Sequence, residues 1–397
     1  MNFVYISPQF PKNFWHFCDE LKKNGLTVLC IGDTPYNELS NELKGAMTEY
    51  YKVNNMENYD EMVKAMGYFV FKYGKIDWLE SNNEYWLEQD AKLRTDFNIT
   101  TGLHTDHILE IKTKSGMKAF YEAAGVKTAR YHLTSTLEEG LKFIEQVGYP
   151  VVVKPDNGVG AAATYKLKNE DELRDFYNGE YIKHYQYIME EFVNGDLMSF
   201  DGVCDLDRNP LFITSHVFPN QIMDVVNEGT GMHYYSVREL PEDLMKAGIA
   251  TVKSFRTNGR CFHCEFFRLR EDKEGLGKKG EIIGLEVNMR TPGGYTPDMF
   301  NYANDINFYK IYADMVAFGK AEYTTTRPYH CVYVGRRDGD NYEHSLEEIS
   351  NKYGFGMLMN ERMPDILAGA MGNHCLMQRF ATMDEVNEFV AYCLKTK

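Results

Sequence analysis

The sequence predicts a multidomain protein of mixed α/β and α+β class, and three patterns support this prediction. Apolar strand-like runs alternate with helical runs over residues 1–105, which favours a parallel sheet covered by helices. Two strand-like runs, 261–270 and 281–290, flank a polar, glycine-rich stretch and predict an antiparallel hairpin. The tail, 326–397, shows the order strand, helix, strand, strand, helix. At 397 residues the chain is too long for one ordinary core.

Four units are expected from these patterns. The first is the α/β block, and the second is a smaller α+β unit that contains the apolar strand YPVVVKP. The third unit contains the hairpin, and the fourth is the tail, expected to be a compact cap built around strands at 330–337, 355–360 and 374–380. The predicted boundaries are 1–105, 106–200, 201–325 and 326–397.

The first block is expected to act as a scaffold and as one wall of a substrate cleft. No GxGxxG motif follows its first strand, so the sequence gives little support for a dinucleotide site there. The polar residues Glu80, Asn82, Asn83 and Glu84 follow the last predicted strand of the block. Ligands bind beyond the carboxyl ends of strands in open α/β sheets, so these residues are either ligand contacts or a polar loop.

Composition and charge limit the classes of partner. The formal net charge is −15 and the basic residues are dispersed, which disfavours nucleic acid and anionic membranes as partners. No apolar run approaches the length of a membrane span, and the N-terminus does not resemble a signal peptide. The eight cysteines are scattered, as buried thiols are in a reducing compartment, so a cytoplasmic location is expected.

The predicted hairpin places oxygen-bearing side chains together. Glu286 and Asn288 are two residues apart, so on a strand they point to the same face, and the partner strand brings Glu265 beside them. Carboxylate and amide oxygens suit Mg²⁺, which keeps several waters and takes further ligands from phosphates. Arg290 lies two residues further along the same face and can contact a phosphate or carboxylate as a planar fork.

A second candidate site follows the apolar strand that ends at Lys154. Small residues come directly after it, among them Gly158, Gly160 and Ala161, and small side chains let backbone N–H groups approach phosphate oxygens. It is not a Walker A loop, because the lysine precedes the glycines. Many ordinary strand-to-turn junctions would match the same short pattern.

Further candidates are weaker when each is taken alone. The run Glu190–Val193 leads from a strand into a turn, where a linker between two lobes could offer backbone groups to an adenine and carboxylates to its amino group or ribose. It could equally be an acidic hairpin. His216 and His233 are candidates for substrate contact, although lone histidines are commonly structural. The backbone of Gly293 and Gly294 could bind a substrate carboxylate.

The order of these segments resembles the ATP-grasp superfamily. Lys114 in TKSGMK, Lys154 with its small-residue loop, MEEFVNG, CEF and LEVNMR follow one another as in that superfamily, over residues 106–320. LEVNMRTPGG is particularly similar to a stretch of carboxylate–amine ligases, among them the L-amino-acid ligases. The resemblance implies an ATP-grasp fold preceded by a Rossmann-like pre-ATP-grasp domain and followed here by a small α+β cap.

The resemblance also implies roles for residues. Lys114 and Lys154 match the phosphate-contacting lysines, the run Glu190, Glu191, Phe192 and Val193 matches the adenine hinge, and Glu265, Glu286 and Asn288 match the magnesium ligands. Arg290 matches the arginine that stabilises the transferred phosphoryl group or the acyl-phosphate. At the ribose position the family often has a glutamate, whereas this chain has Leu197 preceded by Asp196. Either Asp196 replaces that glutamate or the ribose is held less directly.

The implied activity is the ATP-dependent joining of a carboxylate to an amine through an acyl-phosphate, with ADP and phosphate released. The implied cofactors are ATP and Mg²⁺, normally two ions, with Mn²⁺ as a substitute. The expected partners are small-molecule carboxylates and amines, and relatives often form dimers, so a homodimer is a candidate assembly. Two alternatives stay open: a carboxylase-type relative that activates bicarbonate, and a nucleotide-binding regulatory protein without catalysis.

Overall fold

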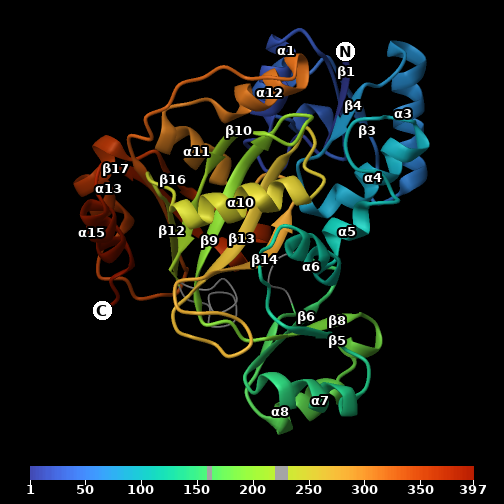
Figure 1. The fold of residues 1–397 in the computed structure, drawn as a ribbon. Coiled ribbons are helices and arrows are strands. Elements are labelled where there is room, and N and C mark those ends of the chain that lie inside the picture. The colour runs from blue at the N-terminus through green and yellow to red at the C-terminus, as the bar shows by residue number, and fades with distance from the viewer. Residues whose placement is uncertain (159–162, 220–230) are drawn as a thin grey trace.

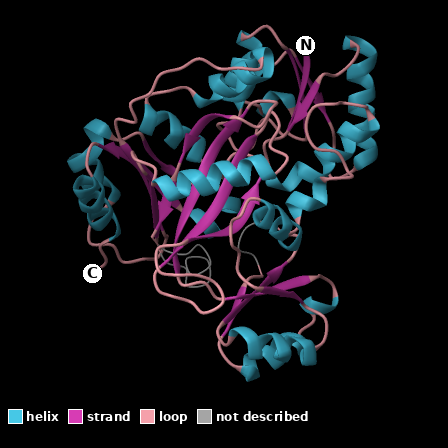
Figure 2. Ribbon diagram, viewed as in Figure 1, coloured by secondary structure: helices cyan, strands magenta, loops and turns pink. Residues whose placement is uncertain are grey.

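The computed structural model describes residues 1–158, 163–219 and 231–397, and three β-sheets organise them (Figures 1 and 2). A parallel sheet belongs to the N-terminal block. A small antiparallel sheet forms a lobe that projects from the body of the molecule, and a large antiparallel sheet forms the centre of that body. None of the helices in these three ranges combines the length and apolarity required to cross a bilayer.

The N-terminal sheet confirms the predicted α/β block. Its four strands are parallel in the order β3-β2-β1-β4, so successive residues of β1 face opposite layers. Phe3 and Tyr5 pack into one apolar cluster, whereas Val4 and Ile6 pack into another on the other face. Burial on both faces is typical of parallel sheets. The strands are β1 (Asn2–Ile6), β2 (Thr27–Gly32), β3 (Glu49–Lys52) and β4 (Trp78–Glu80).

Helices cover this sheet and lead into the next unit. Helix α3 begins after Asn58, whose side chain caps it, and ends at Gly74, a glycine with φ of 82°. The helices of this region are α1 (Trp15–Lys23), α2 (Asn41–Ala46), α3 (Tyr59–Tyr73), α4 (Leu87–Asp96), α5 (Ile108–Lys112) and α6 (Lys114–Ala123), with 3₁₀ turns η1 (Tyr36–Glu38) and η2 (Glu84–Trp86).

The projecting lobe is a four-stranded antiparallel sheet in the order β5-β8-β6-β7. One face packs against α7 and α8 through an apolar core that includes Val151, Val153 and Tyr187. In Figure 1 the lobe lies below the large sheet, with these two helices on its outer side. Its elements are β5 (Tyr131–Leu133), β6 (Val151–Pro155), β7 (Tyr165–Leu167), β8 (Tyr187–Glu191), α7 (Leu137–Val147), α8 (Glu170–Asn178) and η3 (Tyr181–Lys183).

The large sheet runs β14-β13-β9-β11-β12-β15-β17-β16, with β10 paired to β9, among the described residues. Helix α10 crosses in front of β9, β13 and β14 in Figure 1. The elements up to residue 318 are β9 (Gly195–Cys204), β10 (Pro210–Thr214), β11 (His216–Phe218), β12 (Met232–Ser236), α10 (Glu242–Ser254), β13 (Cys261–Leu269), β14 (Ile282–Asn288), α11 (Thr296–Asn304) and α12 (Phe308–Phe318).

The tail differs from its predicted form in two ways. First, β15 pairs with β12, so the tail extends the large sheet and does not form a sheet of its own. Second, the strand expected at 355–360 begins only at Met359, because a 3₁₀ turn occupies Gly354–Gly356, and an additional helix, α14, follows it. The tail elements are β15 (His330–Arg336), α13 (Leu346–Tyr353), η4 (Gly354–Gly356), β16 (Met359–Arg362), α14 (Asp365–Met371), β17 (His374–Phe380) and α15 (Met383–Leu394).

Candidate active site

A cavity of about 370 Å³ lies between the projecting lobe and the large sheet. Its lobe side includes residues of β6 and β8 together with the start of α6, and its other side is formed by β9, β11, β12, β13, β14 and α14. Most predicted site residues line it. They are Lys114, Lys154, Glu190, Glu191, Phe192, Val193, Glu265, Glu286, Asn288, Arg290, Gly293 and Gly294.

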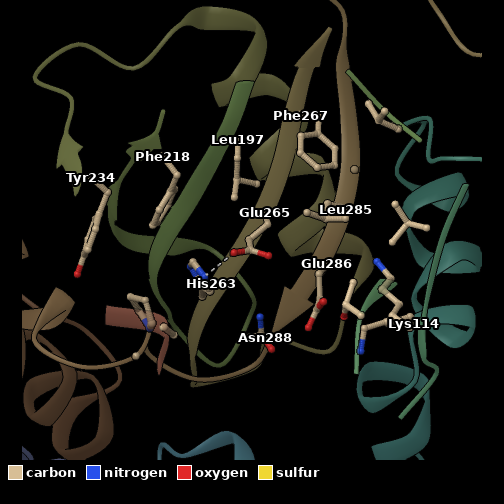
Figure 3. Close-up of a pocket in the computed structure, with 18 of the residues that line it drawn as sticks. Lys114, Leu197, Phe218, Tyr234, His263, Glu265, Phe267, Leu285, Glu286 and Asn288 are labelled. Carbon is tan, nitrogen blue, oxygen red and sulfur yellow. Dashed lines mark ion pairs between the residues drawn. The ribbon is translucent and has the colours of Figure 1, made fainter. Parts of the chain in front are cut away.

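The hairpin of β13 and β14 brings the three predicted metal ligands together. Glu265 is directly opposite Glu286 in the antiparallel register, and Asn288 lies on the same face of β14 as Glu286. The ladder shifts register after Glu265. Figure 3 shows the three side chains side by side at the centre of the cavity.

The donor set fits magnesium. Two carboxylates and an amide oxygen supply hard oxygen ligands, and Mg²⁺ usually takes one or two carboxylates together with water and substrate phosphates. Within residues 1–158, 163–219 and 231–397, no group of three or more His, Cys, Asp or Glu side chains is arranged to bind a metal. The three residues therefore suit an ion that is shared with a phosphorylated ligand better than a closed protein cage.

Two lysines and a glutamate form a buried ion cluster on the lobe side. Glu190 accepts from Lys118 and, at 2.6 Å, from Lys154. Burial would raise the pKa of Glu190, but the two lysines lower it to about 2. Burial alone would lower the pKa of Lys154, yet the attraction of Glu190 and Glu286 raises it. Lys154 is therefore held as a cation that faces the acidic hairpin.

Lys114 and the small-residue loop flank this cluster. Lys114 begins α6, and its Nζ donates to the carbonyl oxygen of Gly158 at 3.4 Å. Figure 3 places Lys114 on the opposite side of the cavity from Tyr234. Gly160 and Ala161, the other predicted loop contacts, lie outside the described residues.

Arg290 follows β14 and is fixed by a residue from the N-terminal block. Its Nε donates to Glu84 at 3.0 Å, and Glu84 also accepts from Lys112 at 2.6 Å. Burial would raise the pKa of Glu84, but the charges of Arg290 and Lys112 lower it, so the carboxylate is ionised. Glu84 is one of the polar residues predicted either to contact ligand or to form a loop, and here it orients Arg290.

Residues 117–261 match a family model described as an ATP-grasp domain. This part of the chain is therefore similar to ATP-grasp domains. The matched range covers α6, the projecting lobe and the first strands of the large sheet, which together with the hairpin surround the cavity.

Two known ligases resemble parts of the chain in sequence. An L-arginine-specific L-amino acid ligase of Bacillus subtilis is 24% identical over 246 residues, which cover 59% of this chain and 56% of the ligase. A D-alanine–D-alanine ligase of Clostridium botulinum is 34% identical over 199 residues, which cover 46% and 58%. The chain thus spans less than two thirds of the length of these relatives.

A solved ligase structure matches nearly the whole chain. The L-amino acid ligase from Bacillus licheniformis superposes with a TM-score of 0.70 and 16% identity, and the match covers 98% of this chain and 95% of that one. At this identity the similarity establishes the fold alone. The N-terminal block and the tail are therefore part of the shared architecture.

The four residues predicted to form the adenine hinge differ in part from their predicted contacts. Phe192 and Val193 line the cavity as expected, and Lys166 lies over the Phe192 ring at 3.7 Å. Glu191, however, is fully buried, and its oxygens accept from Arg130 at 2.7 Å. Glu190 is occupied by the lysines. Both glutamates line the cavity, but in this arrangement cations hold both carboxylates, so contact with adenine or ribose stays a prediction.

The side chain of Asp196 does not face the cavity. Its neighbour Leu197 lines the cavity, and successive residues of β9 point to opposite faces of the sheet. The Asp196 carboxylate instead pairs with Arg270 at 2.6 Å. The suggestion that Asp196 replaces the ribose-binding glutamate is wrong in this arrangement.

Neither predicted histidine lines the cavity. His216 is buried at the base of the sheet, where its Nδ1 lies 2.9 Å from Asp201. His233 lies on β12 between Met232 and Tyr234, both of which line the cavity, so its side chain points to the other face. The prediction of substrate contact is therefore wrong for both residues.

A third histidine was missed. His263, on β13, lines the cavity between Asp201, at 2.5 Å from Nδ1, and Glu265, at 3.3 Å from Nε2. Burial would lower the pKa of His263, but Asp201 and Glu265 raise it to about 9. The even spacing of His263 and Glu265 on one strand was the available signal. In the sequence, His263 lies between Cys261 and Cys264, a pattern that favours core packing. Both cysteines are buried.

Proposed function

We propose that the protein is an ATP-dependent, ADP-forming ligase that joins a small-molecule carboxylate to an amine through an acyl-phosphate. The observation that carries this proposal is the arrangement across one cavity. Glu265, Glu286 and Asn288 face Lys154 and Lys114, and Arg290 lies at the end of the same strand face. Such a set of charges is what a nucleoside triphosphate and a phosphoryl transfer require.

The proposed reaction has two steps. An oxygen of the substrate carboxylate attacks the γ-phosphorus of ATP, the bond from that phosphorus to the bridging oxygen breaks, and ADP leaves. The amine nitrogen then attacks the acyl carbon, phosphate leaves with the bonding electrons, and the nitrogen loses a proton to solvent. The gain over direct condensation is that phosphate is a good leaving group whereas oxide is not.

The chain's own residues would supply position and charge. Lys154, held as a cation by Glu190, and Lys114 would contact the triphosphate. Arg290, held by Glu84, would face the transferred phosphoryl group and the acyl-phosphate. Phe192 and Val193 would border the adenine. Glu265, Glu286 and Asn288 would hold Mg²⁺, which would neutralise charge on the phosphates.

The test uses hydroxylamine as a general amine. An acyl-phosphate reacts with hydroxylamine to give a hydroxamate and phosphate, so carboxylate activation can be measured whatever the natural amine is. We expect ADP and hydroxamate to form together when a panel of amino acids and organic acids is supplied with ATP and Mg²⁺. ADP formation that depends on bicarbonate and needs no amine would support a carboxylase instead. Nucleotide binding without ADP formation on any substrate would support a non-catalytic protein.

Two matched substitutions connect the activity to the cavity. Glu286→Gln removes one charge from the proposed metal site and is expected to lower kcat by about 10²–10³-fold, the usual cost of losing one well-placed group. Glu281→Gln, just before β14, removes an exposed carboxylate that pairs with Lys127, and it is expected to leave kcat unchanged. Equal activity of the two variants would contradict the role of Glu286.

A further inference from the structure

One end of the cavity is apolar. We define it by Phe218, Met232, Tyr234, Leu367 and Met371, which all line the cavity. The first three belong to one buried apolar cluster, and Leu367 and Met371 pack against it. Phe218 and Tyr234 stack with their ring centroids 4.9 Å apart, and the Tyr234 hydroxyl is engaged with Thr296 at 2.9 Å. The Tyr234 hydroxyl is thus already hydrogen-bonded, and in Figure 3 Tyr234 and Phe218 lie away from Lys114.

No charged side chain of the described residues lines this apolar end. The Lys, Arg, His and Glu residues that line the cavity come from α6, β6, β8, the hairpin and the segment just after it. They are Lys114, Lys154, Glu190, Glu191, His263, Glu265, Glu286 and Arg290. A charged group seated at the apolar end would lose its hydration and find no counterion, which is strongly unfavourable.

The apolar end adjoins the proposed reaction centre. Gly294 follows Arg290 by four residues, has φ of 61° and lines the cavity. A Cβ added at Gly294 would lie 2.5 Å from Sδ of Met371, so α14 packs directly on the loop that leads out of the hairpin. A carboxylate held near Arg290 would therefore have the rest of its molecule next to these apolar side chains.

We propose that the carboxylate substrate carries an uncharged, apolar side group, and that Leu367 and Met371 of α14 help to select it. This inference rests on the proposed function. The backbone loop after Arg290 and the charged residues serve the reacting carboxylate, whereas the apolar end receives the side group. The helix that supplies part of this specificity belongs to the tail and not to the range that matches the family model.

The experiment measures hydroxamate formation with ATP, Mg²⁺ and hydroxylamine. L-leucine, L-methionine and L-phenylalanine are compared with L-glutamate and L-lysine. For the wild type we expect kcat/KM at least tenfold higher with the three apolar amino acids. Leu367→Lys is expected to lower kcat/KM for L-leucine at least tenfold, mainly through KM, and to reduce the discrimination against L-glutamate.

The control variant is Ile366→Lys. Ile366 is the preceding residue of the same helix, is 79% exposed and does not line the cavity, so it tests the cost of a new charge on α14 itself. We expect it to keep the preference of the wild type. Leu367→Ala provides a second variant in case the lysine impairs folding, and it is expected to weaken selection among the apolar amino acids.

The outcomes separate the inference from the proposed function. If L-glutamate or L-lysine is activated as well as L-leucine by the wild type, or if Leu367→Lys behaves like Ile366→Lys, the inference is overturned while the ligase stands. If no carboxylate gives hydroxamate, the proposed function fails. In that case binding of L-leucine and L-glutamate, measured by ligand-observed NMR on the wild type and both lysine variants, still decides whether the apolar end selects apolar ligands.

Discussion

The orientation of Arg290 depends on a carboxylate from another sheet. Glu84 follows β4 of the N-terminal block, and its two oxygens accept from Lys112 and from Arg290. A guanidinium that must meet a phosphoryl group at one position gains from a fixed partner, because small misplacements at a reacting centre are costly. Under the proposed function, Glu84 would therefore be a positioning residue that acts through Arg290.

Glu84→Gln tests this positioning. The amide keeps the size of the side chain but removes the charge that holds Arg290, so we expect kcat to fall by about 10- to 100-fold with little change in the KM for ATP. Steady-state ADP formation measures both constants. The control is Glu42→Gln, which removes the charge of an exposed glutamate on α2. An unchanged kcat in Glu84→Gln would show that Arg290 does not need this partner.

The site residues differ in whether their roles could be predicted from the sequence. Glu265, Glu286 and Asn288 were found because strand alternation fixes which residues share a face, and the hairpin needs no long-range information. Glu84 was not assigned its role because Arg290 lies far away in sequence. His263 was missed because Asp201 is distant in sequence and because the surrounding Cys-x-x-Cys pattern favours core packing. Asp196 and His233 were misplaced, since the face of the sheet that borders the cavity depends on how the lobe and tail pack.

At the scale of elements, Tyr121 connects α6 to the hairpin strands β13 and β14. Its hydroxyl donates to the carbonyl oxygens of Glu286, at 3.0 Å, and Glu265, at 3.3 Å. The ring lies against Gly284, where an added Cβ would be 2.5 Å from ring carbons. The absence of a side chain at Gly284 therefore lets helix and hairpin approach closely.

Gly284→Ala is expected to separate α6 from β14. The added methyl group must displace the buried Tyr121 ring, so we expect the free energy of unfolding to fall by about 1–3 kcal/mol. Gly67→Ala is the matched control, because Gly67 lies on α3 with no atom within 4 Å of the added Cβ, and it should be neutral or slightly stabilising. Urea unfolding followed by circular dichroism compares the two variants with the wild type.

A buried carboxyl group joins α11, α12 and the loop before α1. Asp298 accepts from Asn13 at 2.7 Å and from the Tyr309 hydroxyl at 2.8 Å. Burial raises the pKa of Asp298 to about 6, against the lowering effect of those two hydrogen bonds. Of the nearby charged groups, Glu361 raises this pKa further and Lys12 lowers it.

This shift predicts a pH dependence of stability. An unfolded aspartate has a pKa of about 3.9, so between about pH 4 and pH 6 the folded chain keeps a proton that the unfolded chain has lost. The stabilisation from Asp298 is therefore complete below about pH 4 and is lost as the pH rises through 6. We expect Asp298→Asn to gain about 2 kcal/mol relative to the wild type between pH 4.5 and 7.5. Urea unfolding of both proteins at the two pH values measures this, and an equal difference at both would contradict it.

The tail shows what local patterns miss at this scale. The strands of β15 and β17 were predicted because each is a continuous apolar run. Helix α14 was not, because it has seven residues and its stability comes from packing on the Gly294 loop and the apolar cluster. A contact of that kind cannot be read from the spacing of residues within the helix.

For the whole molecule, the cavity between the lobe and the large sheet couples ligand binding to stability. A ligand that binds only the folded state adds about 2.7 kcal/mol at a concentration 100 times its Kd. We expect MgATP to raise the melting temperature of the wild type more than ATP with EDTA does. Asn288→Ala should lose the increment that depends on Mg²⁺ and keep the response to ATP alone. Equal shifts with and without Mg²⁺ in the wild type would argue against the metal site.

The continuity of the large sheet has a consequence for shortened forms of the protein. Strand β12 supplies Met232 and Tyr234 to the cavity and is covered on its other edge by β15. A chain that stops before residue 330 would leave that edge unpaired, with backbone donors and acceptors free to join other molecules. Such a truncation is expected to yield aggregates instead of a smaller folded protein, so the last strands protect the edge of the sheet that borders the cavity.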